Sequence, residues 1–407
     1  MGRRTASLIA LALAALPAPA AAAPDCPERS ETRVLLEGQG TLESVIVDPR
    51  GPLFFTNERS VLRLERPGEQ PTVLAEVEEP GGLAFDLAGN LIVGFGNTAS
   101  NGARGDATGP SGLMRIDPVS GAKEVYATGL SMANGLVRGP DGSFYASNDF
   151  GRNIDRVVNG QTERGWAHVP SGNGLAIDTG GRWLYAAQTF QPAAIQQVDL
   201  SDPERVTPYV EAGPGDQQAG LDGMDRDAAD QLFVTANGAG QVWRVAGSPP
   251  EICVVVRGLP GFPDGPSAVA VGRPGTPFPP THLYVVAFDG RLHEIAGAAA
   301  AEPPPPGRRG AAGGPAAQAP LRVRVRPTVV VRRQRRRFSI VVERFADHGW
   351  QPVPGATVRF AGRRLRTRAD GTLRFRHRFA RAGRRHVRAF AAGVRSRAVT
   401  IVVRRTA

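Results

Sequence analysis

The sequence predicts an all-β protein, a six-bladed β-propeller followed by a small β-sandwich domain. A six-residue motif recurs six times at intervals of roughly 40 to 50 residues, which is typical of propeller blades. Beyond residue 320, apolar residues alternate with arginine, and this period of two indicates strands. We therefore predict a signal peptide over 1–23, the propeller over 24–296, an Ala/Gly/Pro-rich linker over 297–320 and the sandwich over 321–407.

The N-terminus has the layout of a secretory signal peptide. Arg3 and Arg4 precede an apolar run from Ala6 to Leu16, and small residues continue to Ala23. The run is too short to span a bilayer, and no later segment is apolar for long enough to form a membrane helix. The chain is therefore expected to be secreted or held at the cell surface.

The next segments are expected to build and close the ring. Residues 30–37 should form a strand that completes the last blade, because closure removes an exposed sheet edge. Each motif is then followed by a turn and a second apolar run. Blade two carries a long irregular insertion over 97–111, rich in Gly, Asn, Asp and Thr, and insertions of this length are often lids or binding loops.

Cys26 and Cys253 are the two cysteines of the chain, and export makes a disulfide between them expected, with two free thiols as the alternative. Cys26 precedes the closing segment. Cys253 lies in the apolar run 251–257, the predicted outermost strand of blade five. A bond would fasten the closing segment to the ring. No Cys-x-x-Cys or Cys/His zinc pattern is present.

The two predicted domains differ in charge. Residues 321–407 hold 25 Arg against 3 acidic residues, a net charge of +22, whereas residues 1–320 hold 24 Lys and Arg against 35 acidic residues, a net charge of −11. Anionic cell-wall polymers or another anionic surface are the expected partners of the basic domain. Nucleic acid is disfavoured because few aromatic residues are interleaved with the arginines and the chain is expected to be exported.

Within the basic domain, Asp370-Gly371 is a hairpin signal. The segments that begin at Pro354 and Ala369 resemble the immunoglobulin-like domains appended to many bacterial surface proteins.

The first position of the recurring motif carries an oxygen-bearing side chain in all copies but one. The residues at this position are Glu43, Gly81, Asn134, Asn173, Asp222 and Ser267. Equivalent positions of radially repeated blades lie around one axis, so these side chains are expected to converge. The predicted metal ligands are Glu43, Asn134, Asn173 and Asp222. Carboxylate and amide oxygens without sulfur or imidazole suit calcium, with magnesium or manganese as alternatives.

The alternative explanation is that these dipeptides form turns. Asn-Gly and Asp-Gly are ordinary turn dipeptides, and any one of them alone is more often a turn than a ligand. Turn chemistry does not by itself predict their agreement in register across separate blades, nor Glu43 in the first copy. Gly81 leaves a gap in the ring through which a substrate could approach, and Ser267 is positioned to add a hydrogen bond.

Several stretches resemble the senescence-marker-protein/gluconolactonase family, which includes the luciferin-regenerating enzyme. They are the segment around Glu43, the segment 172–178 and the segment 222–244, and the resemblance spans residues 38–296. It implies a six-bladed propeller with a central divalent cation held by Glu43, Asn173 and Asp222, and Asn134 as a further ligand or a substrate contact. Members that hydrolyse gluconolactone carry Arg two residues before that Asn, where this chain has Met132.

The resemblance implies metal-assisted hydrolysis of a lactone or ester small molecule. Asp222 is the candidate base or nucleophile, and Asp149, at the end of the second run of blade three, is expected to reach the same face and orient water. A serine hydrolase is disfavoured because no Gly-x-Ser-x-Gly motif is present. The alternative function is a non-catalytic, metal-stabilised propeller that serves as a binding module at the cell surface.

Overall fold

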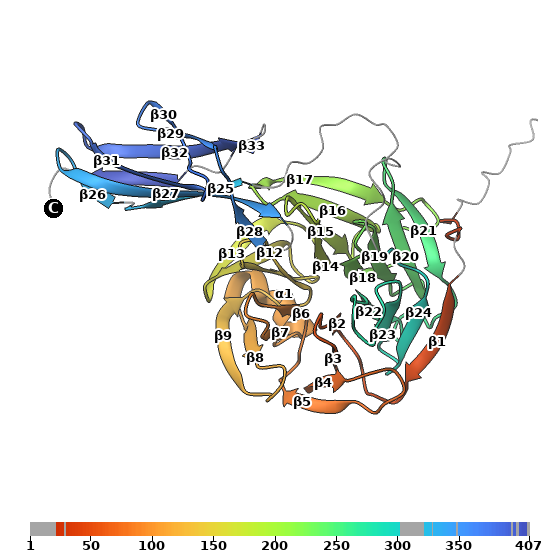
Figure 1. Ribbon diagram of the computed structural model, residues 1–407. Helices are drawn as coiled ribbons and strands as arrows, with labels where there is room; N and C mark the ends of the chain where they lie inside the picture. Colours follow the sequence, from red (N-terminus) through yellow and green to blue (C-terminus); the bar gives the residue numbers. More distant parts are fainter. Residues whose placement is uncertain are drawn as a thin grey trace, which may run out of the picture.

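The computed structural model describes residues 22–27, 30–301, 321–327, 329–346, 349–391, 394–395 and 399–404. Six four-stranded antiparallel sheets surround a common centre, and a unit of two further sheets follows in the chain (Figure 1). The predicted propeller and sandwich are confirmed. Most of the predicted signal peptide and linker lies outside the described residues. Within them, no helix is long and apolar enough to cross a membrane.

The first three blades each use four consecutive strands. Blade one consists of β2 (Val45–Val47), β3 (Leu53–Thr56), β4 (Ser60–Leu64) and β5 (Thr72–Glu76). Blade two consists of β6 (Leu83–Phe85), β7 (Leu91–Phe95), β8 (Ser111–Ile116) and β9 (Lys123–Leu130), with α1 (Ala99–Thr108) between β7 and β8. Blade three consists of β10 (Leu136–Arg138), β11 (Phe144–Ser147), β12 (Asn153–Val158) and β13 (Gln161–His168).

The last three blades follow the same plan, except that the sixth takes its outer strand from the N-terminus. Blade four consists of β14 (Gly172–Ile177), β15 (Trp183–Gln188), β16 (Ala194–Asp199) and β17 (Asp202–Glu211). Blade five consists of β18 (Leu221–Arg226), β19 (Leu232–Ala236), β20 (Gln241–Ala246) and β21 (Glu251–Val256). Blade six consists of β22 (Pro266–Val271), β23 (Leu283–Ala287), β24 (Leu292–Ala296) and β1 (Glu31–Leu36).

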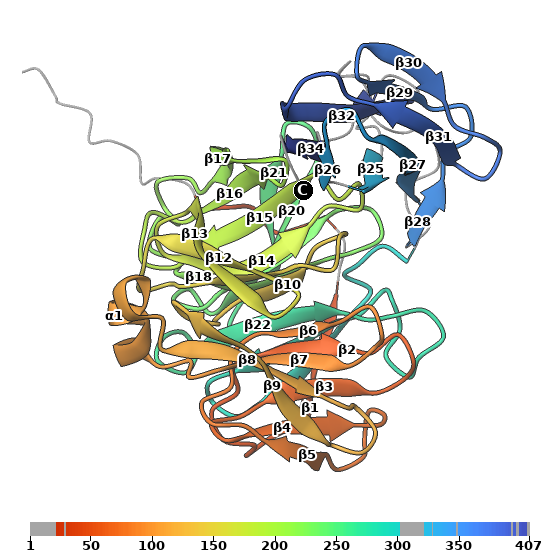
Figure 2. The same cartoon turned by 90° about the vertical axis from the view of Figure 1, so that its left-hand side faces the viewer.

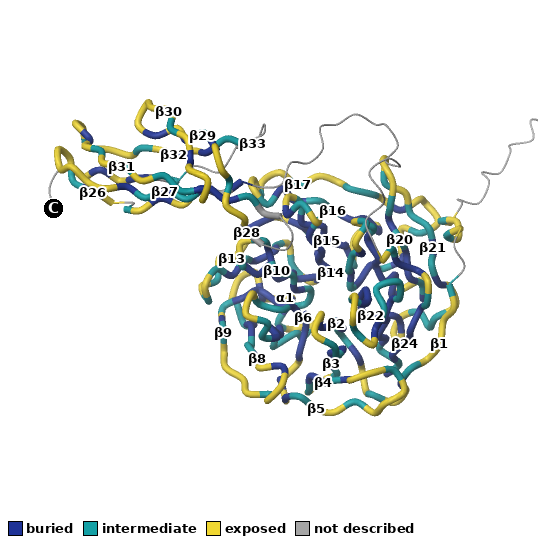
Figure 3. The backbone as a smooth tube through the Cα atoms, in the orientation of Figure 1, coloured by how far each residue is buried: buried dark blue, intermediate teal, exposed yellow. Residues whose placement is uncertain are grey.

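Burial follows distance from the centre of the ring (Figure 3). Second strands such as β3, β11, β19 and β23 are buried at every position, because each blade packs between two others. Outermost strands such as β5 and β17 are mostly exposed. Continuous apolar runs therefore mark the second strand of a blade.

The N-terminal segment ties blades five and six together. As predicted, β1 completes blade six by pairing antiparallel with β24. Just before it, the Cys26 backbone N–H donates to the Val254 carbonyl at 2.8 Å, and the Val254 N–H donates to the Pro24 carbonyl at 2.8 Å. The structure joins Cys26 to Cys253 in a disulfide at this position, on the outer strand of blade five.

The blade-two insertion is not irregular, so that prediction is wrong. Thr98 caps α1 by accepting a hydrogen bond from the Asn101 N–H, and Gly109 ends the helix in the left-handed conformation. Gly102 and Gly105 suggest a loop, but both face inward. A Cβ on Gly105 would lie 1.8 Å from the Ser131 carbonyl oxygen, so close packing requires these glycines. Figure 2 shows α1 projecting from one face of the disc.

The C-terminal unit has two sheets. The first contains β25 (Leu321–Arg326), β27 (Arg335–Ala346), β28 (Gly349–Pro352) and β31 (Thr372–Arg378). The second contains β26 (Val329–Val331), β29 (Thr357–Phe360), β30 (Arg363–Arg366), β32 (Gly383–Ala391), β33 (Val394–Arg395) and β34 (Val399–Arg404). Phe338 from the first sheet and Phe360 from the second are both buried, and their ring centroids lie 5.0 Å apart in a core between the sheets. The immunoglobulin-like resemblance of this unit stays a prediction.

The hairpin expected at Asp370-Gly371 does not form. A tight turn is present, in which the Gly371 N–H donates to the Arg368 carbonyl. However, β30 and β31 on either side belong to different sheets, and β31 pairs with β27 instead. A local turn signal cannot distinguish a hairpin from a turn that crosses between sheets, because both need the same left-handed glycine.

Candidate metal centre

The four predicted ligands line one small central cavity of about 60 Å³. Each stands at or just before the start of an innermost strand: Glu43 before β2, Asn134 before β10, Asn173 in β14 and Asp222 in β18. Because the innermost strands all start on the same face of the ring, the repeat brings these residues together. Ser267 lines the same cavity, but its hydroxyl donates to the backbone carbonyls of Leu42 and Val286.

The glycine that follows Asn134, Asn173 and Asp222 has a packing role rather than a turn role. Asn173-Gly174 and Asp222-Gly223 lie inside strands, and neither glycine has a positive φ. A Cβ on Gly174 would lie 2.3 Å from the Asp222 carbonyl oxygen of the next blade, and one on Gly135 would lie 2.2 Å from the Asn173 carbonyl oxygen. The dipeptides therefore allow neighbouring blades to approach at the axis, which rules out the turn explanation for these copies.

Asn97 fills the position that Gly81 leaves free. Its Cγ lies 3.1 Å from where a Gly81 Cβ would be, and its Nδ2 donates to Glu43 Oε1 at 3.0 Å. Its Oδ1 is buried and has no hydrogen-bond partner. The expected substrate gap at blade two is therefore occupied by an amide that adds one more oxygen to the site.

Asp149 does not line the cavity, but it lies close enough to Glu43 and Asp222 for its charge to act on both. It follows β11 and is buried, and its Oδ1 has no hydrogen-bond partner. Burial raises the pKa of Asp149 to about 6, although hydrogen bonds from the Asn134 side chain and the backbone lower it in part. Burial and then the Asp149 charge raise the pKa of Glu43 to about 7. Burial and then the charges of Glu43 and Asp149 raise the pKa of Asp222 well above its usual range. Two buried carboxyl groups and the half-buried Glu43 thus lie close together.

Asn173 is held in place by its neighbour in blade four. Its Nδ2 donates to Thr189 Oγ1 at 2.9 Å, and the Thr189 hydroxyl donates to the Leu221 carbonyl at 2.7 Å, next to Asp222. The Asn173 side chain also lowers the pKa of Asp222 by hydrogen bonding. Thr189 therefore links blades four and five beside Asn173 and Asp222.

The residues present fit a hard divalent cation. Their contacting atoms are carboxylate and amide oxygens, the buried Asn97 Oδ1 and Asp149 Oδ1 lack partners, and the cavity lining contains no basic side chain. No cluster of three or more His, Cys, Asp or Glu side chains with metal-ligand geometry occurs among the residues that the structure describes. The site therefore depends on amide oxygens beside its carboxylates.

The roles of Asn97 and Thr189 beside the predicted ligands were not predicted from the sequence. Both follow the second apolar run of a blade, as do Asn57, Asn148 and Asn237. This second column of polar residues is visible in the sequence. It could have indicated the second set of loops on the same face.

The propeller is similar to several solved structures. A gluconolactonase from Xanthomonas campestris superimposes with a TM-score of 0.52 at 17% identity, covering 69% of this chain and 97% of that chain. The calcium-binding protein regucalcin from Agrobacterium tumefaciens gives 0.52 at 18% identity, covering 67% and 96%. The luciferin-regenerating enzyme gives 0.50 at 13% identity, covering 67% and 99%. No protein-family model and no curated protein matches the sequence.

These likenesses show that the chain has the propeller fold of the family that its motifs resemble. At the position where gluconolactone-hydrolysing members carry Arg, Met132 is buried, and a Cβ on Gly102 of α1 would lie 2.7 Å from its sulfur. The helix therefore covers the residue that replaces the arginine.

Proposed function

We propose that the propeller is a divalent-cation-dependent hydrolase of a lactone or ester, with calcium as the first candidate ion and magnesium or manganese as alternatives. The observation that carries this proposal is a cluster of three carboxyl groups: Glu43 and Asp222 line a cavity without a basic side chain, and the charge of Asp149 beside them raises the pKa of both. Buried carboxylates are costly unless a cation compensates them. The amide oxygens of Asn134 and Asn173 add ligands without adding charge.

The chain's own residues fit the chemistry of acyl transfer to water. A bound cation would polarise the substrate carbonyl and stabilise negative charge on its oxygen. Asp149 has a free carboxylate oxygen and a pKa of about 6, so near neutral pH it can take a proton from water. Asp222 is the other candidate proton acceptor or nucleophile, and Asn173 fixes its orientation.

The test is turnover of a panel of lactones and esters with calcium and after chelation. Asp149→Asn should lower kcat by roughly 100-fold or more, the usual contribution of a general base. Asp178→Asn is the matched control: this partly buried carboxylate follows the other end of β14, and its Oδ1 accepts from the Arg182 and Trp183 N–H groups, which an amide oxygen can also do. Equal turnover with and without chelator would contradict the proposal.

A second candidate function is a non-catalytic binding module stabilised by the cation. Met132 in place of the arginine of gluconolactone-hydrolysing relatives favours it. Tight cation binding without turnover of any member of the panel would support this alternative.

We also propose that the protein acts outside the cytoplasm. The layout of residues 1–23 and the bond between Cys26 and Cys253 support this, since disulfides persist in oxidising compartments. Mass spectrometry of non-reduced peptides from the natural host would test it. Two free thiols would contradict it.

A further inference from the structure

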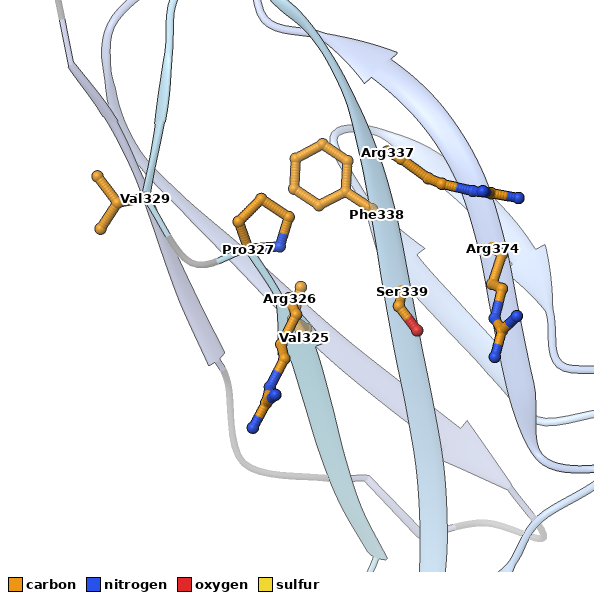
Figure 4. A pocket seen from close by; sticks show the side chains of 8 residues that line it. All are labelled: Val325, Arg326, Pro327, Val329, Arg337, Phe338, Ser339 and Arg374. Carbon is orange, nitrogen blue, oxygen red and sulfur yellow. The ribbon is translucent and has the colours of Figure 1, made fainter. Parts of the chain in front are cut away.

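The first sheet of the sandwich carries an uncompensated set of arginines on its outer face. Opposed residues in an antiparallel pair point to the same side, and Arg337 lies opposite Arg376 while Arg335 lies opposite Arg378. One row further, Ser339 lies between Arg326 and Arg374 (Figure 4). The exposed arginines of this face are Arg326, Arg335, Arg337, Arg374, Arg376 and Arg378. Like charges directly opposite one another destabilise a sheet.

Acidic residues do not neutralise this face. The described part of the unit contains two of them, Glu343 and Asp370. Glu343 forms an ion pair with Arg324 at 2.8 Å, and Asp370 accepts hydrogen bonds from Thr372. The six arginines therefore depend on solvent or on a ligand for counter-charge.

The same face is hollowed. A depression of about 810 Å³ is lined by Arg326, Arg337, Arg374 and the Ser339 side chain, with Pro327 and Val329 among its apolar residues. Guanidinium groups form paired hydrogen bonds with phosphate oxygens, and the hydroxyl can add another. The hollow therefore has room for more than one phosphate group at the end of the arginine rows.

We propose that this face binds a linear polymer of repeated phosphate groups. Successive rows of a strand are about 7 Å apart, which suits phosphates joined by a short linker. The rings that alternate with these arginines point into the core: Phe338 is fully buried and Phe375 packs against the same core. The three arginine rows themselves contain no ring, so bases have no stacking partner within them, and the rows favour a phosphate chain over single-stranded nucleic acid.

The test uses the full chain with inorganic polyphosphate, a wall polymer of polyol phosphate and single-stranded DNA as three probes. Arg337→Gln with Arg376→Gln should weaken polyphosphate binding roughly tenfold or more and reduce its salt dependence. The thermal midpoint should stay unchanged or rise, because the change removes a like-charge pair.

The matched control is Arg364→Gln with Arg388→Gln, which removes the same charge from the other sheet, where both residues lie opposite Arg359. This pair should weaken binding less than threefold or so. Equal weakening by both pairs, absence of binding to either phosphate polymer, or tighter binding of DNA would each overturn the proposal. Comparison of the two phosphate polymers distinguishes a wall ligand from free polyphosphate.

Two exposed phenylalanines lie on the face of the propeller where the innermost strands begin. Phe150 and Phe190 are 43% and 58% exposed, and their ring centroids lie 5.1 Å apart. Phe150 directly follows Asp149, and Phe190 directly follows Thr189, the partner of Asn173. An exposed aromatic pair therefore lies next to the central cavity. A site for a sugar would be expected to have polar side chains at this position instead.

We infer that the substrate carries an apolar chain or ring beside its lactone or ester group; this inference rests on the proposed function. Exposed aromatic pairs at a site offer apolar area to a ligand. α1 extends this wall, because a Cβ on Gly102 would lie 3.0 Å from Phe150 Cδ2. The buried Met132 beneath the helix adds no charge to it.

The test compares γ-nonalactone with γ-butyrolactone, which lacks the alkyl chain. The longer lactone should have kcat/KM at least about tenfold higher, since each buried methylene adds to binding. Phe150→Ala with Phe190→Ala should bring this ratio towards one. Leu87→Ala, an exposed residue in the turn between β6 and β7 on the opposite face, should leave it unchanged.

The same experiment distinguishes failure of the apolar-substrate inference from failure of the proposed hydrolase function. Hydrolysis of both lactones at equal efficiency would overturn the inference and keep the hydrolase. If neither is hydrolysed, saturation-transfer NMR still reads binding: preferential binding of γ-nonalactone that the double variant loses supports the aromatic site, and equal binding of both lactones overturns it.

Discussion

The propeller and the sandwich both hold charge that their own residues do not neutralise, but they place it differently. In the propeller, net negative over 1–320, Asp149 and Asp222 are buried near the axis and Glu43 is half-buried beside them. In the sandwich, net positive over 321–407, the arginines lie on the outside of the sheets. Buried like charges are costly, whereas exposed ones are screened by water and salt.

The difference indicates two kinds of ligand. A cluster of three carboxyl groups needs a small cation that fits within its cavity. An exposed array of guanidinium groups suits a long anion that lies across it. We therefore expect the cation site to be tight and geometrically selective, and the arginine face to bind more weakly and with greater sensitivity to salt.

The largest expected effect is at the centre of the propeller. Asp222→Ala removes a charged ligand, and hydrolysis should fall on the order of a thousandfold. Asn134→Ala should cost less, because it removes an amide oxygen rather than a charge. Measurement of kcat/KM on one substrate for both variants decides the order. Equal losses would mean that charge is not what distinguishes the two ligands.

The next effect concerns ring closure. Replacing Cys26 and Cys253 together by Ser removes a cross-link between residues 227 apart. The stability lost should be about 5 kcal/mol by the entropy of the unfolded chain. Urea unfolding of the oxidised protein and the variant measures it. Coincident unfolding curves would show that pairing of β1 with β24 closes the ring without the disulfide.

A smaller effect is expected from pH in the cation-free protein. The folded pKa of Glu43 is raised from 4.5 to about 7, so the folded state keeps this proton to higher pH than the unfolded state. Stability should therefore fall as pH rises from about 4.5 to 7, by on the order of 3 kcal/mol.

Unfolding in chelator at pH 5 and pH 7 measures this loss, and calcium should abolish it. Glu43→Gln is the control that removes the titrating group. Stability that rises over this interval in chelator would count against a cation-compensated cluster.

The smallest effect belongs to the sandwich. Arg335→Gln removes one half of the like-charge pair with Arg378 and should stabilise the domain by less than about 1 kcal/mol. High salt should give the unmodified protein a similar gain. Thermal unfolding at low and high salt tests both. A variant that is less stable at low salt would mean that Arg335 has a structural role.

The repeat made most of the propeller predictable. The motif that begins at Glu43, Asn134, Asn173 and Asp222 sets the innermost strand of each blade, and radial symmetry then brings the ligands together. The role of the following glycine was not predictable. Gly174 is needed because the backbone of blade five leaves no space for a side chain there. The distance between two blades cannot be predicted from the sequence.

Features that break the repeat were the ones predicted least well. The helix α1 occurs once, and its glycines suggest a loop unless the surface beneath it is known. Asn97 reaches the site from the loop after β7, beside Gly81 of the same blade, and the repeated motif does not include that loop. The Asp370-Gly371 turn joins two sheets, and local sequence does not specify which sheet a strand joins.

Calcium titration of the chelated, full-length protein by calorimetry shows directly whether the central carboxylates hold a cation. We expect one tightly bound ion per chain, lost in Asp222→Ala and retained in Asp178→Asn. Binding that is absent from the unmodified protein with calcium, magnesium and manganese alike, or that is unchanged in Asp222→Ala, would contradict it.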